Sequence, residues 1–332
     1  MRLRNSDRIG RLPLARLGSL ILTLGCGLVL GQPPAPPPDE PGPPTFRADT
    51  RLVVLNASVV DKSGKLITNL PQSAFKVFEN GVEQTLKIFR REDVPVSMGI
   101  IVDNSGSMRD KRQKVEAAAL ALVKASNPQD EVFIVNFNDD PYLDVPFTND
   151  PKKMQEGLAR IDSRGGTAMR DAISTSMDYA RKKGKRDKKV LLVITDGNDN
   201  ASNETLERLV ERAKGADNGV LIYAIGLLNE EEKREARQAK RALDALTQAT
   251  GGLSYYPKEL ADVNAICLQV AHEIRNQYIL AYSPNTQVWD GTYRTIKVTV
   301  NAPGHPVVRT RSGYYAGARH TSASASEVAP RH

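Results

Sequence analysis

Five oxygen-bearing side chains follow three separate segments of the sequence: Asp103, Ser105, Ser107, Thr167 and Asp196. The first three come at or after the end of the apolar run 96–102, Thr167 follows a glycine pair, and Asp196 follows the apolar run 190–195. Two carboxylates and three hydroxyls, with no His or Cys among them, are typical ligands of a hard cation. The pattern therefore predicts a site for Mg²⁺ or Mn²⁺, and not for zinc or copper.

Each residue type has a chemical reason to be there. Asp103 and Asp196 offset the charge of a divalent cation, while Ser105 and Ser107 lie two residues apart and face the same way from the turn at Gly106. So few carboxylates leave the cation electron-poor, and a carboxylate from a partner can replace one of its waters. The alternative is that each residue caps a helix, since Asp, Ser and Thr are favoured caps. The five together, in this order, favour the metal site.

The surrounding sequence predicts how these residues are positioned. Continuous apolar runs at 96–103, 132–137, 190–195 and 220–226 are typical of strands buried on both faces of a parallel sheet. Helical patterns alternate with them at 108–126, 151–161, 168–183, 203–217, 232–250 and 259–276. The alternation predicts a doubly wound α/β domain over residues 94–276. Ligands bind such sheets at the carboxyl ends of the strands, where Asp103 and Asp196 fall.

The flanking segments are β-rich on both sides of this unit. Segment 48–93 contains strand patterns at 52–60, 75–78 and 85–89, and Asn80-Gly81 predicts a hairpin between the last two. Segment 277–318 contains strand patterns at 277–282, 293–300 and 307–311. We expect one β-sandwich built from both segments, with the α/β domain inserted between them.

The N-terminal segment predicts an exported protein. Residues 1–31 carry five Arg before an uncharged, Leu-rich stretch, which is the layout of a secretory signal. Residues 32–47 hold eight prolines and form a linker, and 319–332 are expected to be a disordered tail. An uncleaved N-terminal anchor, or lipidation at Cys26, stays open as an alternative. The expected location is periplasmic, cell-envelope or secreted, with membrane contact only through such an anchor.

Composition argues against a nucleic-acid partner. The chain has 332 residues and a formal net charge of +7, but removing the signal segment, with five Arg and one Asp, leaves +3. The remaining basic cluster 181–186 has no interleaved aromatic residues and is typical of a solvated helix end. Cys267 lies in a helical apolar pattern and is expected to be a buried thiol.

The five-residue pattern resembles the metal-ion-dependent adhesion site (MIDAS) of von Willebrand factor type A domains. The matching segments are Asp103-Asn104-Ser105-Gly106-Ser107, Gly165-Gly166-Thr167 and Thr195-Asp196-Gly197. The wider chain resembles a bacterial exported family related to these domains, through segments 75–81 and 311–315. The resemblance implies that Asp103, Ser105 and Ser107 form the first loop of the site. It implies that Thr167 is a ligand directly or through water, that Asp196 acts through water, and that a partner carboxylate completes the coordination.

Three functions remain to be weighed. The first is an exported binding or adhesion module that captures an acidic group of a protein or polymer partner through the metal. The second is a structural or assembly protein of the envelope with a vestigial site. The third is a metal-assisted hydrolase, but no His precedes His272 in the α/β segment, and neither a nucleophile elbow nor a phosphate loop is present. We therefore expect a binding protein and not an enzyme.

Overall fold

The computed structural model describes residues 52–91, 93–159, 163–197, 199–215, 219–228, 233–286 and 288–317. The predicted signal, linker and tail, at 1–31, 32–47 and 319–332, lie outside these ranges. Within them, no helix is both long enough and apolar enough to cross a membrane.

A six-stranded sheet forms the centre of the α/β part, in the order β10-β9-β8-β5-β6-β7. Neighbouring strands are parallel except β6 and β7, which are antiparallel. The fold class predicted from the sequence is thus confirmed, although the antiparallel edge strand β7 and the short β10 were not predicted. The strands are β5 (Val96–Asp103), β6 (Glu131–Phe137), β7 (Pro141–Thr148), β8 (Lys188–Thr195), β9 (Leu221–Gly226) and β10 (Ser254–Tyr255).

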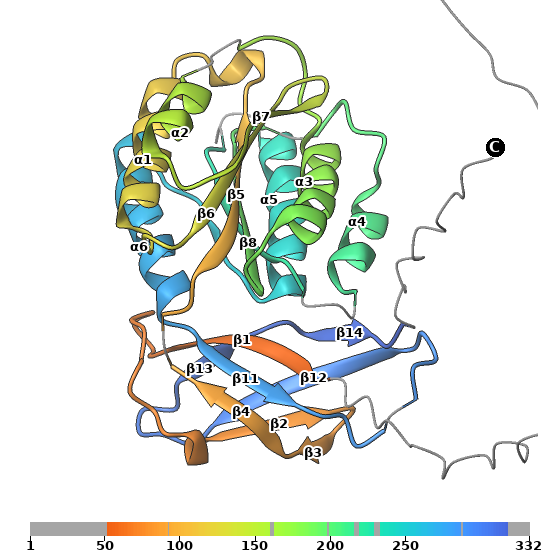
Figure 1. The fold of residues 1–332 in the computed structure, drawn as a ribbon. Helices are drawn as coiled ribbons and strands as arrows, with labels where there is room; N and C mark the ends of the chain where they lie inside the picture. Colours follow the sequence, from red (N-terminus) through yellow and green to blue (C-terminus); the bar gives the residue numbers. More distant parts are fainter. Residues whose placement is uncertain are drawn as a thin grey trace, which may run out of the picture. The chain divides into compact units, whose positions relative to one another are not determined.

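Helices cover both faces of this sheet (Figure 1). One face packs against α1 (Arg112–Ala125), α2 (Pro151–Leu158) and α6 (Val263–Arg275). The other face packs against α3 (Met169–Lys183), α4 (Leu206–Ala213) and α5 (Lys233–Thr250). Alternate residues of each strand therefore enter separate cores, which explains why the runs read as continuously apolar.

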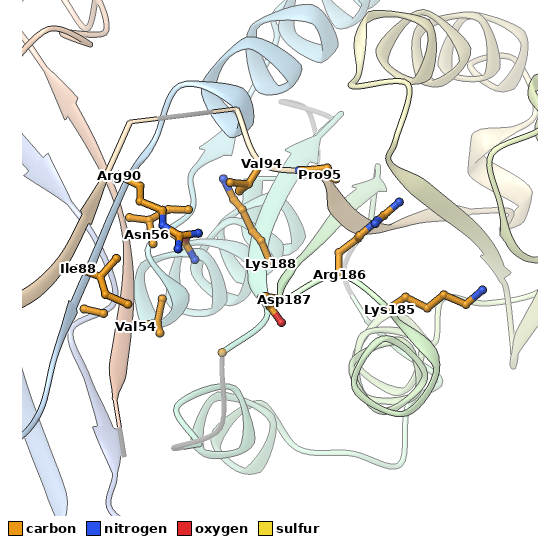
Figure 2. Close-up of a pocket in the computed structure, with 13 residues that line it drawn as sticks. Val54, Asn56, Ile88, Arg90, Val94, Pro95, Lys185, Arg186, Asp187 and Lys188 are labelled. Atoms are coloured by element: carbon orange, nitrogen blue, oxygen red, sulfur yellow. The ribbon is translucent and has the colours of Figure 1, made fainter. Parts of the chain in front are cut away.

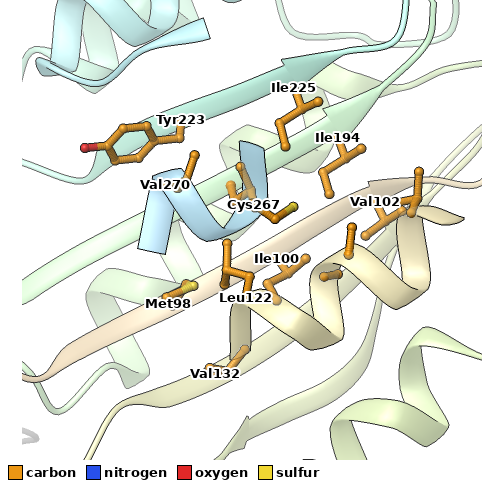
Figure 3. Packing of buried hydrophobic residues seen from close by; sticks show 14 of the residues in the cluster. Met98, Ile100, Val102, Leu122, Val132, Ile194, Tyr223, Ile225, Cys267 and Val270 are labelled. Carbon is orange, nitrogen blue, oxygen red and sulfur yellow. The ribbon is translucent and has the colours of Figure 1, made fainter. Parts of the chain in front are cut away.

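One of the two cores lies between the sheet and helices α1 and α6 (Figure 3). Ile100 of β5 and Leu122 of α1 are fully buried there, together with Cys267 and Val270 of α6. The prediction that Cys267 is a buried thiol is confirmed, and burial raises the pKa of this thiol to about 12. Such a thiol is a packing group and stays protonated at neutral pH.

Two antiparallel sheets form the flanking β part, and each takes strands from both chain segments. Their orders are β13-β1-β11-β4 and β14-β12-β2-β3, with a shared core that includes Leu55, Val77 and Tyr278. The strands are β1 (Val53–Val60), β2 (Phe75–Glu79), β3 (Val82–Gln84), β4 (Leu86–Arg90), β11 (Tyr278–Tyr282), β12 (Tyr293–Val300), β13 (Val307–Arg309) and β14 (Gly313–Tyr315).

The predicted pairing of 75–78 with 85–89 is wrong in detail. The turn at Asn80 and Gly81, which have φ angles of 48° and 81°, joins β2 to β3. The chain then crosses to the other sheet, where β4 pairs with β11. The physical reason is the shared core, because β4 in the opposing sheet lets Leu86 and Phe89 pack against the same apolar cluster.

A buried carboxylate joins α6 to the β part. Glu273 is 2% exposed and accepts hydrogen bonds from Ser58 Oγ (2.8 Å), Tyr223 OH (3.1 Å) and Arg309 Nη2 (2.7 Å). Ser58 and Arg309 belong to the β part, whereas Tyr223 lies on β9 of the α/β part. We call this cluster the Glu273 junction.

Candidate metal centre at the carboxyl edge of the sheet

Two of the predicted site residues meet because their strands are neighbours. β5 pairs with β8 in parallel, with Val102 opposite Ile194. Asp103 is the last residue of β5, and Asp196 directly follows the end of β8. Both acids therefore stand at the same carboxyl edge, where ligands of open α/β sheets bind. We call this edge, with the loops that follow it, the crest.

Asp103 organises the first loop of the crest. Its side chain is fully buried, with Oδ1 accepting from the Ser105 amide (2.9 Å) and Oδ2 accepting from Thr195 Oγ1 (2.5 Å). Burial raises the pKa of this carboxyl to about 6, although the hydrogen bonds from Ser105 and Thr195 act in the opposite direction. Asp103 thereby connects this first loop, which carries Ser105 and Ser107 and which we call the serine loop, to the end of β8.

Ser105, Ser107 and Asp196 form a continuous chain of oxygens. The two serine hydroxyls lie 3.1 Å apart, and Ser107 Oγ donates to Asp196 Oδ1 at 2.9 Å. Ser105 and Asp196 are 2% and 7% exposed, whereas Ser107 is exposed. The second oxygen of Asp196, Oδ2, forms an ion pair with the ammonium of Lys111. The cluster thus holds a cation already, in the form of a lysine side chain.

Thr167 lies in a second loop that contacts the first. The Gly106 amide donates to the Gly165 carbonyl at 3.4 Å, and the Thr167 amide donates to Asn200 Oδ1 at 2.8 Å. A methyl group built on Gly197 would lie 3.8 Å from Thr167 Oγ1, so this hydroxyl is close to the segment that carries Asp196. The loops that follow β5 and β8 and the loop before α3 therefore converge at the crest.

The glycine pair before Thr167 is required by a close approach. Gly165 has a φ of +73°, and a Cβ placed there would lie 2.1 Å from Asp139 Oδ2. The same carboxylate accepts from the Gly166 amide at 2.7 Å through Oδ1. Asp139 therefore fixes a left-handed turn that only glycine adopts without strain.

Sequence reasoning missed three residues that support the crest, Asp139, Asn200 and Lys111, and it named Thr195 within a motif without giving it a role. Thr195, Asp139 and Asn200 hold the three loops in place through the bonds described above, and Lys111 pairs with Asp196. Thr195 and Lys111 leave a signal in the sequence. Thr195 directly precedes Asp196, and Lys111 comes four residues after Ser107, a spacing that places two side chains on one face of a helical segment.

The donor set fits a hard divalent cation. It offers neutral hydroxyl oxygens and two carboxylates, which are oxygen ligands of the kind that Mg²⁺ and Mn²⁺ take. The ammonium of Lys111 on Asp196 shows that positive charge is accommodated at this point. Among the described residues, no group of three or more His, Cys, Asp and Glu could hold a metal ion. The candidate set at the crest is not such a group, since three of its five side chains are hydroxyls.

A cavity of about 540 Å³ lies apart from the crest (Figure 2). Its lining includes Val54 and Ile279 of the β part and Lys188 at the start of β8. Lys188 Nζ donates to the Ile274 carbonyl at 2.5 Å, near the end of α6, and burial lowers the pKa of this amine to about 7. This lysine holds the end of a helix, and none of the five predicted site residues lines the cavity.

Comparison with known families identifies a stretch of the α/β part. Residues 98–198 match the family profile described as von Willebrand factor type A domain. This stretch of the chain is a von Willebrand factor type A domain. The match begins within β5 and ends just after Asp196, so it spans all five residues of the predicted site.

Two curated relatives share about a quarter of their aligned residues with this chain. Calcium-activated chloride channel regulator 1 from Equus caballus is 24% identical over 175 residues, which cover 50% of this chain and 18% of the relative. The same regulator from Sus scrofa is 25% identical and is covered over 17% of its length. This chain thus spans less than a fifth of the length of these curated relatives.

Solved structures with some similarity include bacterial and animal proteins. BatB from Bacteroides thetaiotaomicron has a TM-score of 0.44 and 19% identity, covering 54% of this chain and 98% of BatB. The type V pilus tip protein Mfa5 from Porphyromonas gingivalis has a TM-score of 0.45 and 13% identity, covering 55% of this chain and 95% of the Mfa5 domain. A mussel byssus thread matrix protein with a zinc-occupied MIDAS motif has a TM-score of 0.43 and 14% identity, covering 59% of this chain and 49% of the mussel protein.

Proposed function

We propose that this protein is an exported binding module that captures an acidic group of a protein or polymer partner through a divalent cation at the crest. The observation that carries the proposal is the Asp196 carboxylate, which links the Ser107 hydroxyl to a positive charge beside the Thr167 loop. Mg²⁺ or Mn²⁺ is the cation that this oxygen set favours.

Each residue has a defined part in this proposal. Ser105, Ser107 and Thr167 would provide hydroxyl oxygens, and Asp103 and Asp196 would provide negative charge. A bound divalent cation would supply the positive charge that attracts a partner carboxylate. Asp103 keeps the Ser105 amide and the end of β8 together, which presets the distance between the serine loop and Asp196. The exposed Ser107 marks the side from which a partner reaches the crest.

Binding is favoured over hydrolysis by the surroundings of the crest. A hydrolase needs a general base within hydrogen-bond reach of a water or a substrate. His272 lies on α6 and contacts Asn276, and in this proposal the crest carboxylates Asp103 and Asp196 offset the charge of the cation instead of acting as a base. An assembly protein with a vestigial site is the second candidate, and the converging loops argue against a site that has decayed.

The test is retention of partners on the immobilised protein in Mg²⁺ and in EDTA, with wild type, Ser107→Ala and the control Ser63→Ala. Ser63 lies in an exposed turn of the β part, where its hydroxyl donates to Asp61. We expect partners to be retained by wild type and Ser63→Ala in Mg²⁺ and to be lost from Ser107→Ala. Retention that is the same in Mg²⁺ and EDTA would favour the assembly role, and turnover of an ester or phosphoester in Mg²⁺ would favour the enzyme.

A further inference from the structure

We infer that Lys111 is a built-in counter-cation that competes with the divalent metal for Asp196 and so sets the metal affinity of the crest. This inference rests on the proposed function, because it concerns the regulation of the same site. Its starting point is the ion pair between Lys111 Nζ and Asp196 Oδ2. The two partners are unequal in exposure, since the side chain of Asp196 is 1% exposed and that of Lys111 is 31% exposed.

Local backbone structure brings the lysine to this carboxylate. A 3-10 helix, Gly106–Met108, follows Ser105, and the Lys111 amide donates to the Met108 carbonyl at 3.0 Å. This tight turn brings Lys111 within contact of Asp196, one residue before α1 begins at Arg112. Ser107 and Lys111 then reach Asp196 from the same segment, with Oδ1 accepting from the serine and Oδ2 from the lysine.

Two other cations of the same segment are bound elsewhere. Arg109 donates to the Ser163 carbonyl at 3.3 Å, so its guanidinium is directed to the neighbouring loop. Arg112 is fully buried and donates to Asn136 Oδ1 at 2.6 Å and to the Leu158 carbonyl at 3.3 Å. Of the cations in the described ranges, Lys111 is the one paired with Asp196.

Because both are positively charged, the Lys111 ammonium and a divalent metal ion exclude each other at Asp196. A divalent ion close to the Asp196 oxygens would lie next to the ammonium of Lys111, and the two positive charges repel each other strongly in a partly buried site. Release of the lysine is feasible, because its flexible stem is one-third exposed and its ammonium is readily hydrated. The buried Asp196 cannot leave in the same way. Metal binding is therefore coupled to movement of Lys111 into solvent.

This exchange has two consequences. Without metal, Lys111 offsets the charge of a carboxylate that burial would otherwise destabilise. When metal binds, the apparent affinity equals the intrinsic affinity multiplied by the fraction of metal-free molecules in which the lysine has left Asp196. The apparent affinity is therefore lower than the intrinsic one. The crest residues thus keep their arrangement without metal, and they take up metal only where divalent ions are abundant.

The experiment is calorimetric titration of Mg²⁺ and Mn²⁺ into metal-free protein, with Lys111→Met, Lys111→Arg and the control Lys114→Met. Methionine keeps much of the stem but removes the charge, and Lys114 is exposed at the start of the same helix. We expect Lys111→Met to bind metal on the order of tenfold more tightly than wild type. Lys111→Arg and Lys114→Met should remain within about twofold of wild type.

A thermal melt of each metal-free variant provides a second readout. Lys111→Met should melt at a lower temperature than wild type without metal, because Asp196 loses its counter-charge, and it should gain more on adding metal. Equal or weaker metal affinity in Lys111→Met would overturn the inference and leave the proposed function intact. If no variant takes up metal, both the inference and the proposed function are overturned.

Discussion

The crest and the Glu273 junction both hold nearly inaccessible carboxylates, yet they are built differently. Glu273 is surrounded by donors from distant elements, since Ser58, Tyr223, Tyr255 and Arg309 all donate to its two oxygens. Asp196 receives one hydroxyl and one ammonium, and both come from the segment 107–111, which begins at the second serine of the first loop.

The difference separates a structural carboxylate from one that is available for exchange. At the junction, four donors from four different strands contact Glu273, so the loss of one of them leaves three in place. At the crest, Lys111 is a flexible and partly exposed side chain, and its departure requires only rotation of that side chain. A buried acid whose counter-charge can leave is suited to accept another cation, whereas a buried acid that is enclosed holds the domain together.

The largest effect that the comparison predicts is at the junction. Glu273→Ala should lower the free energy of unfolding by about 3–5 kcal/mol, because it leaves the Arg309 guanidinium and buried hydroxyls without their acceptor. Urea denaturation at neutral pH measures this change, which should be the same with and without Mg²⁺. A loss below about 1 kcal/mol would show that the junction is not the enclosed structural cluster described here.

A surface ion pair provides the matched control for that measurement. Lys76 and Glu83 form a salt bridge with side chains that are 61% and 53% exposed. Glu83→Ala should cost about 0.5 kcal/mol or less, because solvent screens such a pair.

The next effect is a dependence of stability on pH caused by Lys188. Its folded-state pKa is lowered by burial from 10.5 to about 7, so the unfolded chain holds this proton more tightly than the folded protein does. The folded state is therefore penalised in full below about pH 7, and the penalty fades as the pH rises toward 10.5. Between these limits wild type should gain about 1 kcal/mol per pH unit relative to Lys188→Met. Urea midpoints at pH 7, 8 and 9 test this, and parallel curves for the two proteins would contradict it.

A smaller effect is expected at the crest from Asp139→Ala. This change removes the acceptor of the Gly166 amide and should cost about 1 kcal/mol of stability or less, since the bond is exposed. It should weaken metal binding severalfold, because the loop that carries Thr167 loses a fixed contact. Calorimetric titration of Mg²⁺ measures the second effect, and unchanged affinity would show that Asp139 does not position this loop.

Much of the α/β fold was predictable because strands buried on both faces produce continuous apolar runs. The runs at 96–103 and 190–195 gave β5 and β8 almost to the residue, and hence the positions of Asp103 and Asp196. Strand β7 escaped prediction because 141–148 is an edge strand of mixed polarity, with two prolines and an aspartate. Edge strands tolerate such residues because one side of their backbone has no ladder to complete.

The candidate residues were also predictable, but their supports were not. Asp103, Ser105, Ser107, Thr167 and Asp196 follow recognisable strand ends or a glycine pair, whereas Asp139 and Asn200 act through contacts between loops that are distant in sequence. Pairing of β4 with β11 was missed for a similar reason, since the choice of sheet is decided by the shared core and not by the local pattern.

The central claim is that hydroxyls and acids from three loops hold a divalent cation at the crest. Its most direct test is the melting temperature of the metal-free protein on addition of millimolar Mg²⁺ or Mn²⁺, compared between wild type and Asp196→Asn. The account predicts a rise in wild type that is absent in Asp196→Asn. An unchanged melting temperature in wild type, together with no calorimetric uptake of either ion, would contradict it.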